Sequence, residues 1–216
     1  MSTQTQLHVQ PEVVYPESDG QPMAENTLQF EWITTIKGGL DAVFRDDHNV
    51  FVAGDLLWYP VEGDNTIRTA PDVMVVFGRP KGHRGSYQQW LENNIPPQVV
   101  FEVISPGNRH GEMVRKFQFY QRYGVEEYYT YDPEYGELTG WQRSGAYLQE
   151  IPNMNGWVSA RLGVRFDLAG GELKIHGPDG RPFATYVELA QQREHERHRA
   201  ERLAAQLRAL GIEPEV

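Results

Sequence analysis

The chain has 216 residues, 39% of them hydrophobic, and is therefore long enough to bury one sizeable core. It contains no cysteine, which excludes disulfides and thiolate zinc sites and fits a reducing compartment. A net charge of −10 at pH 7 is atypical of proteins that coat nucleic acid, so any contact with phosphates needs a local basic patch or a metal. The polar start, Met1 to Gln10, lacks the apolar stretch of a signal peptide, and no window approaches ~18 consecutive apolar residues. We therefore expect a cytoplasmic protein with no membrane segment.

The first third of the chain predicts an arm, a helix and a hairpin. Residues 1–21 contain prolines and glycine with little periodicity, which predicts a flexible N-terminal arm. From Pro22 a helical pattern begins, although Gly38-Gly39 weakens it in the middle. The apolar positions that carry the pattern are Leu28, Trp32, Ile36, Leu40 and Val43. Residues 49–59 and the run that starts at Pro71 predict two strands of a β-hairpin.

The middle of the chain predicts a central sheet with helices on its faces. Ser86 and Gln89 predict the cap of a short helix, and residues 99–104 predict a strand. An amphipathic helix follows, then a strand over residues 128–131, and residues 137–176 predict short antiparallel strands that extend or flank the sheet. The fold class is therefore α/β, with a mixed central sheet in one domain over residues 22–183.

The last segment, residues 184–216, predicts a highly charged helix. Leu203, Leu207 and Leu210 follow a four-three spacing, but two heptads are too few for a strong coiled-coil pattern. A solvated terminal helix and a dimerisation arm both remain open. The three leucines offer a possible seam between two copies of the chain, and we expect a homodimer.

Two acidic residues in apolar strands are the main clue to function. Glu102 interrupts the apolar run Val99–Ile104, and Asp72 opens the run that ends at Phe77. Apolar side chains on both phases of the alternation indicate a strand covered on both faces. A carboxylate there costs several kcal/mol unless it has a cation, a metal or its own proton. Because it removes a buried charge, Glu102→Gln is expected to leave the fold intact or even to stabilise it.

A lysine on the following helix completes a candidate site. Glu112, Lys116 and Tyr120 are spaced by four, and Lys116 falls at the edge of the buried helix face, from which its amine can reach the strand ends. Two acids and a lysine suit phosphodiester hydrolysis, in which the acids hold Mg²⁺ or Mn²⁺ and the lysine orients water or stabilises developing charge. We expect Asp72, Glu102 and Lys116 to converge on one pocket, with the two acidic strands adjacent.

An ordered set of residues resembles the Uma-type restriction endonuclease family of the PD-(D/E)XK nuclease superfamily. The set covers roughly residues 22–170 and consists of Pro71-Asp72, Glu102 to Pro106, Glu112 to Lys116, Tyr120, Tyr123 to Tyr129 and Asp132-Pro133. The resemblance implies a restriction-endonuclease-like fold and Mg²⁺- or Mn²⁺-dependent cleavage of DNA that leaves a 5′-phosphate. It also implies roles for single residues. Asp72 and Glu102 would be metal ligands and Lys116 the catalytic lysine, while the Val103 carbonyl and Glu25 would be further ligands.

One position departs from the superfamily pattern. The superfamily places its lysine two residues after the second acid, where this chain has Ile104. The Uma-type families place the lysine on the next helix, and Lys116 matches that arrangement. The departure leaves a second function open, a catalytically silent nuclease fold that serves as an interaction module. A third is a metal-dependent hydrolase of another phosphoester.

Other polar residues have weaker claims to a role. Asp55 is a candidate to support the site without touching the metal, and Glu112 is expected to pair with Lys116 or Arg109. Of the seven histidines, only His195 and His198 show a ligand-like spacing. Because both lie in the charged terminal segment, we expect them to be solvated.

Overall fold

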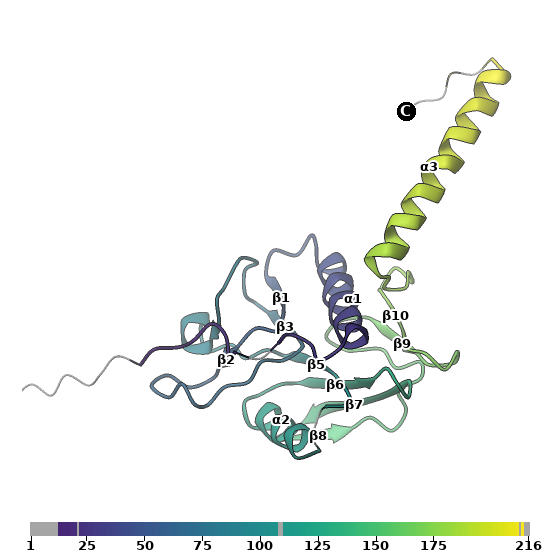
Figure 1. Cartoon of the computed structure of the whole chain (residues 1–216). Helices are drawn as coiled ribbons and strands as arrows, with labels where there is room; N and C mark the ends of the chain where they lie inside the picture. The colour runs from purple at the N-terminus through teal and green to yellow at the C-terminus, as the bar shows by residue number, and fades with distance from the viewer. Residues whose placement is uncertain (1–12, 21, 108–109, 212, 214–216) are drawn as a thin grey trace, which may run out of the picture.

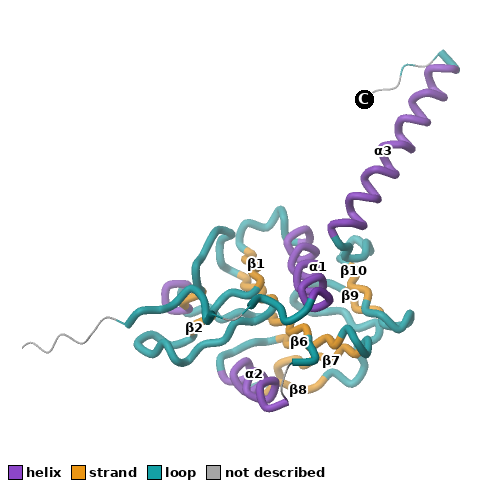
Figure 2. Tube along the Cα trace, viewed as in Figure 1, coloured by secondary structure: helices purple, strands orange, loops and turns teal. Residues whose placement is uncertain are grey.

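The centre of the protein is a six-stranded mixed sheet in the order β1-β3-β5-β6-β7-β8 (Figures 1 and 2). The computed structural model describes residues 13–20, 22–107, 110–211 and 213. The strands are β1 (Val50–Gly54), β3 (Val73–Phe77), β5 (Val99–Val103), β6 (Glu127–Asp132), β7 (Glu137–Ser144) and β8 (Tyr147–Glu150). β5 and β6 are parallel and all other neighbours in this sheet are antiparallel. Strand β3, which follows Asp72, is adjacent to β5, which contains Glu102, as predicted.

Helix α1 (Thr27–Val43) covers one face of the sheet (Figure 1). It begins later than Pro22, because the Asn26 side chain accepts a hydrogen bond from the Gln29 amide at 2.8 Å and so caps the helix. Its buried stripe of Gln29, Ile33, Ile36 and Leu40 packs on apolar residues of the strands. A Cβ at Gly39 would lie 2.2 Å from Cδ2 of Phe183, so glycine at this position allows that ring to pack directly on the helix.

Helix α2 (His110–Arg122) lies on the opposite face (Figure 1). It connects the parallel pair β5 and β6, as such a crossover requires. Tyr120 is its fully buried residue and packs with Met74, Val100 and Tyr128 of the sheet. Side chains of alternate strand positions thus enter two separate apolar clusters, one under each helix.

The hairpin of β1 and β3 is confirmed, but the strand expected over residues 49–59 is broken. Asp55 has φ +47°, a left-handed conformation that ends β1 and turns the chain away from the sheet. The next residues form β2 (Trp58–Tyr59), which pairs in parallel with β4 (Tyr87–Gln88).

The short helix expected to carry Trp90 and Leu91 is present, but the cap predicted from Ser86 and Gln89 is wrong. Ser86 precedes β4, and a single 3₁₀ turn, η1 (Gln89–Glu92), follows without a side-chain cap. The Ser86 hydroxyl instead accepts a hydrogen bond from the Gln88 side chain at 3.3 Å. Strand pairing of Tyr87 with Trp58 therefore displaces the helix start that the local pattern favours.

The described part of the N-terminal arm is not loose. Residues 13–20, here called the strap, run along the loop after β2. The Tyr59 hydroxyl donates to the Pro16 carbonyl at 2.8 Å, and the Gly63 amide donates to the Tyr15 hydroxyl at 2.6 Å. The Tyr15 ring packs against Tyr59 and Trp90. The strap therefore has defined contacts with the rest of the protein. The flexibility expected for residues 1–21 stays a prediction, and residues 1–12 and 21 lie outside the described residues.

The region over residues 137–176 both extends and flanks the sheet, as expected. β7 and β8 extend its edge, whereas β9 (Arg165–Asp167) and β10 (Lys174–His176) form a separate antiparallel pair. Phe166 and Ile175 of this pair are buried in the cluster beneath α1.

Helix α3 (Tyr186–Ala209) projects away from the rest of the protein (Figure 1). Thr185 and Glu188 form a capping box at its start, and none of its residues is buried. The charged terminal helix is thus confirmed. None of the helices in the described ranges combines the length and the apolarity needed to cross a bilayer.

Candidate active site

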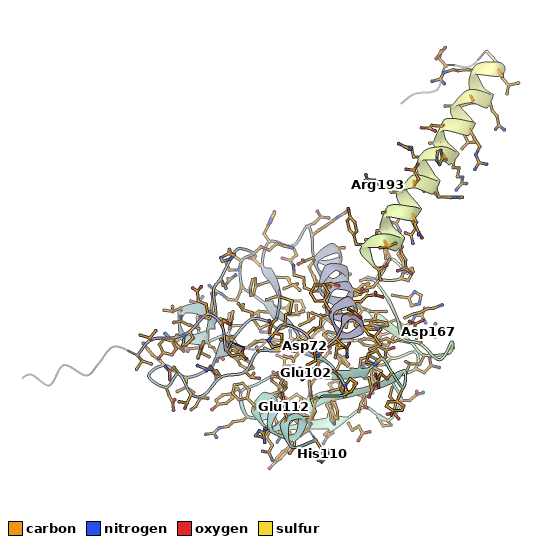
Figure 3. All side chains as sticks on the ribbon, viewed as in Figure 1. Asp72, Glu102, His110, Glu112, Asp167 and Arg193 are labelled. Carbon is orange, nitrogen blue, oxygen red and sulfur yellow. The ribbon has the colours of Figure 1, made fainter. Side chains whose placement is uncertain are left out.

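Three acidic residues occupy one row across adjacent strands. Val73 pairs with Gly54 on β1 and with Phe101 on β5. Continuing both registers by one residue places Asp72 between Asp55 and Glu102, and the Asp55 amide donates to the Asp72 carbonyl at 3.2 Å. Because residues opposite each other in antiparallel strands share a face, Asp72 and Glu102 are directed to the α2 side, and Asp55, just beyond the end of β1, lines the same pocket as Lys116 of α2. Figure 3 shows the labelled Asp72 and Glu102 near the centre of the sheet, with Glu112 on α2.

Glu102 has a specific partner for each carboxylate oxygen. The Lys116 amine donates to Oε2 at 2.7 Å, and the Tyr120 hydroxyl donates to Oε1. Only 3% of the Glu102 side chain and 18% of the Lys116 side chain are exposed. The buried acid that the sequence singled out therefore has a cation and a phenol as partners, both supplied by one face of α2.

Lys116 is held as a cation. Burial alone would lower its pKa, but the attraction of Glu102 and then Asp72 outweighs burial and raises the pKa above its usual value. Its amine remains protonated throughout the neutral range. It can therefore stabilise negative charge and cannot serve as a base.

Asp72 is buried, and within the described part of the chain it has no ion-pair partner. Its Oδ2 accepts the Val103 amide at 2.6 Å. Burial first, and then the charge of Glu102, raise the pKa of Asp72 well above the usual carboxyl value, against the lowering effects of Lys116 and this hydrogen bond. The ionised form of Asp72 thus lacks sufficient compensation from the protein.

A pocket of about 790 Å³ opens beside this row. Asp72, Lys116, Asp55 and Glu25 line its wall, and Glu102 lies behind Lys116 and Tyr120 without lining it. The remaining lining residues are Asp19, Pro22, Met23, Ala24, Gln29, Leu57, Arg68, Thr69, Ala70, Glu112, Arg115 and Phe119. The strap thus contributes an acid to this pocket, and Arg68 and Arg115 contribute cations.

Glu25 and the Val103 carbonyl belong to a second network at the pocket. Glu25 precedes α1 instead of lying within it, and its carboxylate accepts the Ser105 hydroxyl. The Gln29 side chain accepts the Glu25 amide and donates to the Val103 carbonyl, each at 2.8 Å. Gln29 therefore fixes the peptide group that the family resemblance assigns to a metal.

Asp55 and Glu112 both line the pocket. Partial burial first, and then the charge of Asp19, raise the pKa of Asp55, and Lys116 partly offsets this. Glu112 affects Lys116 through its charge, and Arg109, its other expected partner, lies outside the described residues. His198 pairs with Glu194 and Glu201 on the exposed α3, as expected for a solvated histidine.

Within the described ranges, no three His, Cys, Asp or Glu side chains lie close enough together to hold a metal ion. Asp72 and Glu102 also differ in their surroundings. Lys116 and Tyr120 engage the carboxylate of Glu102, whereas Asp72 faces the pocket. The structure thus brings Lys116 to Glu102 and sets Asp72 beside them, and their catalytic roles stay a prediction.

Gln29 and Tyr120 are the polar residues for which the sequence predicted no role. Gln29 occupies the buried stripe of α1 with Ile33 and Ile36, and an amide among apolar residues was the available signal. Tyr120 shares a helix face with Lys116, but the apolar pattern of the helix predicts only that its ring packs in the core. Its hydroxyl partner depends on the β5 register, which local spacing does not reveal.

The fold and the site define a mixed α/β protein with a polar pocket at the ends of its central strands. The Uma2 family model, described as "Putative restriction endonuclease", matches residues 12–175. The chain therefore belongs to the Uma2 family, and the match ends before α3.

One similar solved structure is that of a protein from Anabaena variabilis ATCC 29413, described as a putative nuclease belonging to DUF820. It is 14% identical in sequence, with a TM-score of 0.48 over 70% of this chain and 84% of that one. Among curated proteins, no match to the chain was found.

Proposed function

We propose that the protein is a divalent-metal-dependent endonuclease that hydrolyses DNA phosphodiester bonds. The observation that carries the proposal is that Lys116, paired with Glu102, and the neighbouring Asp72 line one pocket. Membership of the Uma2 family supports a nuclease, and the metal and the DNA substrate are our inference from the site.

The donors at the pocket fit Mg²⁺ or Mn²⁺ in chemistry. All are oxygens, and Mg²⁺ is commonly held by only one or two carboxylates with water as the other ligands. Asp72 is ionised at a cost that a cation would offset. Asp72 would hold the ion from the pocket wall, and the family resemblance implies Glu102, Glu25 and the Val103 carbonyl as further ligands. Lys116 and Tyr120 engage both oxygens of Glu102 in this structure, so Glu102 would have to exchange one of these partners for the ion. When bound, the ion supplies Lewis-acid polarisation of the phosphodiester.

The chain's own residues would bind, orient and stabilise. Lys116, fixed by Glu102, presents a permanent positive charge where negative charge develops on the phosphate. Tyr120 holds Glu102 and Gln29 holds the Val103 peptide, so the polar groups around Asp72 are fixed before substrate arrives. Fixed groups need no reorganisation during the reaction, which lowers its barrier.

Phosphate binding depends on local charge, because the whole chain is acidic. Arg68, Arg115 and Lys116 are the cations of the pocket wall. The same wall carries five carboxylates, so these three cations would contact phosphates individually, and a bound metal ion would supply the further positive charge that a strand of DNA needs there. By family resemblance, cleavage would leave a 5′-phosphate.

A second function is a catalytically silent interaction module with the nuclease fold. The Lys116–Glu102 ion pair favours it, because this pair keeps Glu102 out of the pocket. In that reading Lys116 replaces the metal as the counter-charge, and no cleavage occurs.

The two functions are separated by nuclease assays on supercoiled plasmid and single-stranded DNA with Mg²⁺, Mn²⁺ or EDTA. We expect cleavage that EDTA stops, that E102Q abolishes, and that K116A slows more than it weakens Mn²⁺ binding. The exposed Glu137 and Lys174 provide matched controls, E137Q and K174A. If the wild-type protein cleaves neither DNA with either metal, the nuclease proposal fails. If it cleaves only a small phosphodiester such as bis-p-nitrophenyl phosphate, the substrate is another phosphoester.

A further inference from the structure

Hydrolysis at this site needs a group that accepts a proton from the attacking water. Lys116 is excluded, because its amine is a cation engaged by Glu102. Glu102 is excluded too, since both of its oxygens are hydrogen bonded behind the pocket wall. Among the other carboxylates of the pocket, Glu25 is engaged by Ser105, Asp72 is assigned to the metal, and Asp19 belongs to the strap and not to the row of acids.

Asp55 is the carboxylate best placed to act. It lies opposite Asp72 in the row of acids, lines the pocket and is exposed to solvent. Within the described residues, neither a hydrogen bond nor an ion pair engages its side-chain oxygens, so they are available to a water molecule in the pocket. Because Asp55 is next to Asp72, a water molecule bound to Asp55 would lie beside the groups that would hold the phosphate.

The left-handed backbone at Asp55 does not itself require a carboxylate. Its φ of +47° is a conformation in which glycine, asparagine and aspartate all occur readily. An uncharged glycine or asparagine would serve the turn as well, so the carboxylate is available for a chemical role.

We propose that Asp55 is the catalytic carboxylate that accepts the proton of the attacking water. This inference rests on the proposed nuclease function and adds a residue to it. In the step, the water oxygen forms a bond to phosphorus while one water proton passes to an Asp55 carboxylate oxygen. The bond from phosphorus to the leaving 3′-oxygen breaks with its electron pair, and that oxygen takes a proton from solvent.

Glu112 is the competing acceptor. It also lines the pocket, but from the first turn of α2 and not from the row that contains Asp72. The hydrogen bond from the Asp55 amide to the Asp72 carbonyl fixes the position of Asp55 relative to Asp72, just beyond the paired ends of β1 and β3. No such backbone hydrogen bond among the described residues ties Glu112, on the helix across the pocket, to Asp72, and Asp55 is therefore preferred.

The test compares D55N and D55G with the wild-type protein and with D46N, whose side chain is 88% exposed outside the pocket. Asparagine and glycine both fit the left-handed backbone, so the two variants are expected to fold with an unchanged or higher melting temperature. We expect the single-turnover rate of plasmid cleavage to fall about a hundredfold or more in both, as for loss of a general base. Calorimetric Mn²⁺ affinity should change less than about threefold, and D46N should match the wild type.

Each other outcome overturns the proposal. A D55N rate within about threefold of wild type makes Asp55 structural, and the nuclease function then stands without it. A tenfold loss of Mn²⁺ affinity in D55N makes Asp55 a metal ligand. Loss of cleavage in E112Q with D55N active assigns the proton to Glu112. A wild-type protein that cleaves no DNA removes the nuclease function itself.

Discussion

Glu102 shows how a carboxylate can remain in an apolar strand. Desolvation of an ion pair is costly, but removing one partner is costlier because it leaves the other charge buried. Here Lys116 and Tyr120 satisfy both oxygens, so the charge is compensated even without a metal. The sequence-based expectation that Glu102→Gln is harmless or stabilising must therefore be revised.

We predict that E102Q lowers the free energy of unfolding by about 3 kcal/mol, because it leaves the Lys116 amine without its partner. K116M should cost a similar amount, while the double variant E102Q/K116M should recover most of the loss. Urea denaturation of all four proteins in EDTA measures this cycle. Additive losses in the double variant would show that the two side chains are not coupled.

Removing the charge of Asp72 is expected to have the opposite effect on the free energy of unfolding. Its folded-state pKa is raised by burial and by Glu102, so the folded protein holds this proton more tightly than the unfolded chain does. The tighter proton binding stabilises the folded protein. This stabilisation is fully present below the usual carboxyl pKa of 3.8 and is lost as pH rises through the pKa of the folded state. Ionised Asp72 therefore destabilises the metal-free protein at neutral pH.

We predict that D72N is more stable than the wild type at pH 8 in EDTA, and that its advantage shrinks toward pH 5. The asparagine oxygen can still accept the Val103 amide, so the fold is retained. Melting temperatures measured at several pH values test this, with the exposed D46N as control. An advantage that does not vary with pH would show that the charge is not the cause.

At the scale of elements, the strap changes the shape of the pocket. It places Asp19 on the wall while Tyr15 anchors it through ring contacts and a hydroxyl that accepts the Gly63 amide. Aromatic packing of this kind adds stability beyond the buried area. The pocket therefore depends on a segment whose sequence shows no regular structure.

We predict that Y15A lowers the free energy of unfolding by about 2 kcal/mol and exposes the strap to limited proteolysis. V14A is the matched control, because its side chain is 72% exposed and only its carbonyl is used, by Asn65. Urea denaturation and mass spectrometry of early proteolytic fragments provide the measurements. Equal behaviour of Y15A and V14A would mean that the ring does not hold the strap.

The elements that the sequence predicted well are those with strong local signals. The apolar runs of β3 and β5 and the amphipathic pattern of α2 are enough, from the sequence alone, to single out the two acids and Lys116. The break at Asp55 and the strap were not predictable, because both depend on distant partners. Asp55 turns the chain so that β2 can reach β4, and Tyr15 meets Tyr59 and Trp90.

At the scale of the whole molecule, α3 is separate from the nuclease fold. None of its residues is buried, and its surface carries ion pairs such as Arg197–Glu194 and Arg199–Glu196. Leu203 and Leu210 are 51% and 75% exposed, so the apolar positions could pair with a second copy. The homodimer stays a prediction, as does the cytoplasmic location.

We predict that the full chain is a dimer and that truncation after Ala184 makes it a monomer with intact stability. The cut spares Phe183, which packs against Gly39. Light scattering at tens of micromolar measures the mass, and L203E/L207E tests the seam without shortening the chain. The exposed variant V187E, at the other end of α3, is the control. A full chain that is monomeric under these conditions would leave α3 as a solvated helix.

The projection of α3 also affects how the protein moves through solution. Its 24 residues extend about 36 Å at ~1.5 Å per residue, whereas a compact body of about 160 residues has a radius of gyration near 15 Å. A monomer with such an arm diffuses more slowly than a sphere of equal mass and leaves a gel-filtration column early. Elution volume alone would therefore overstate its mass, and a monomer could be mistaken for a dimer.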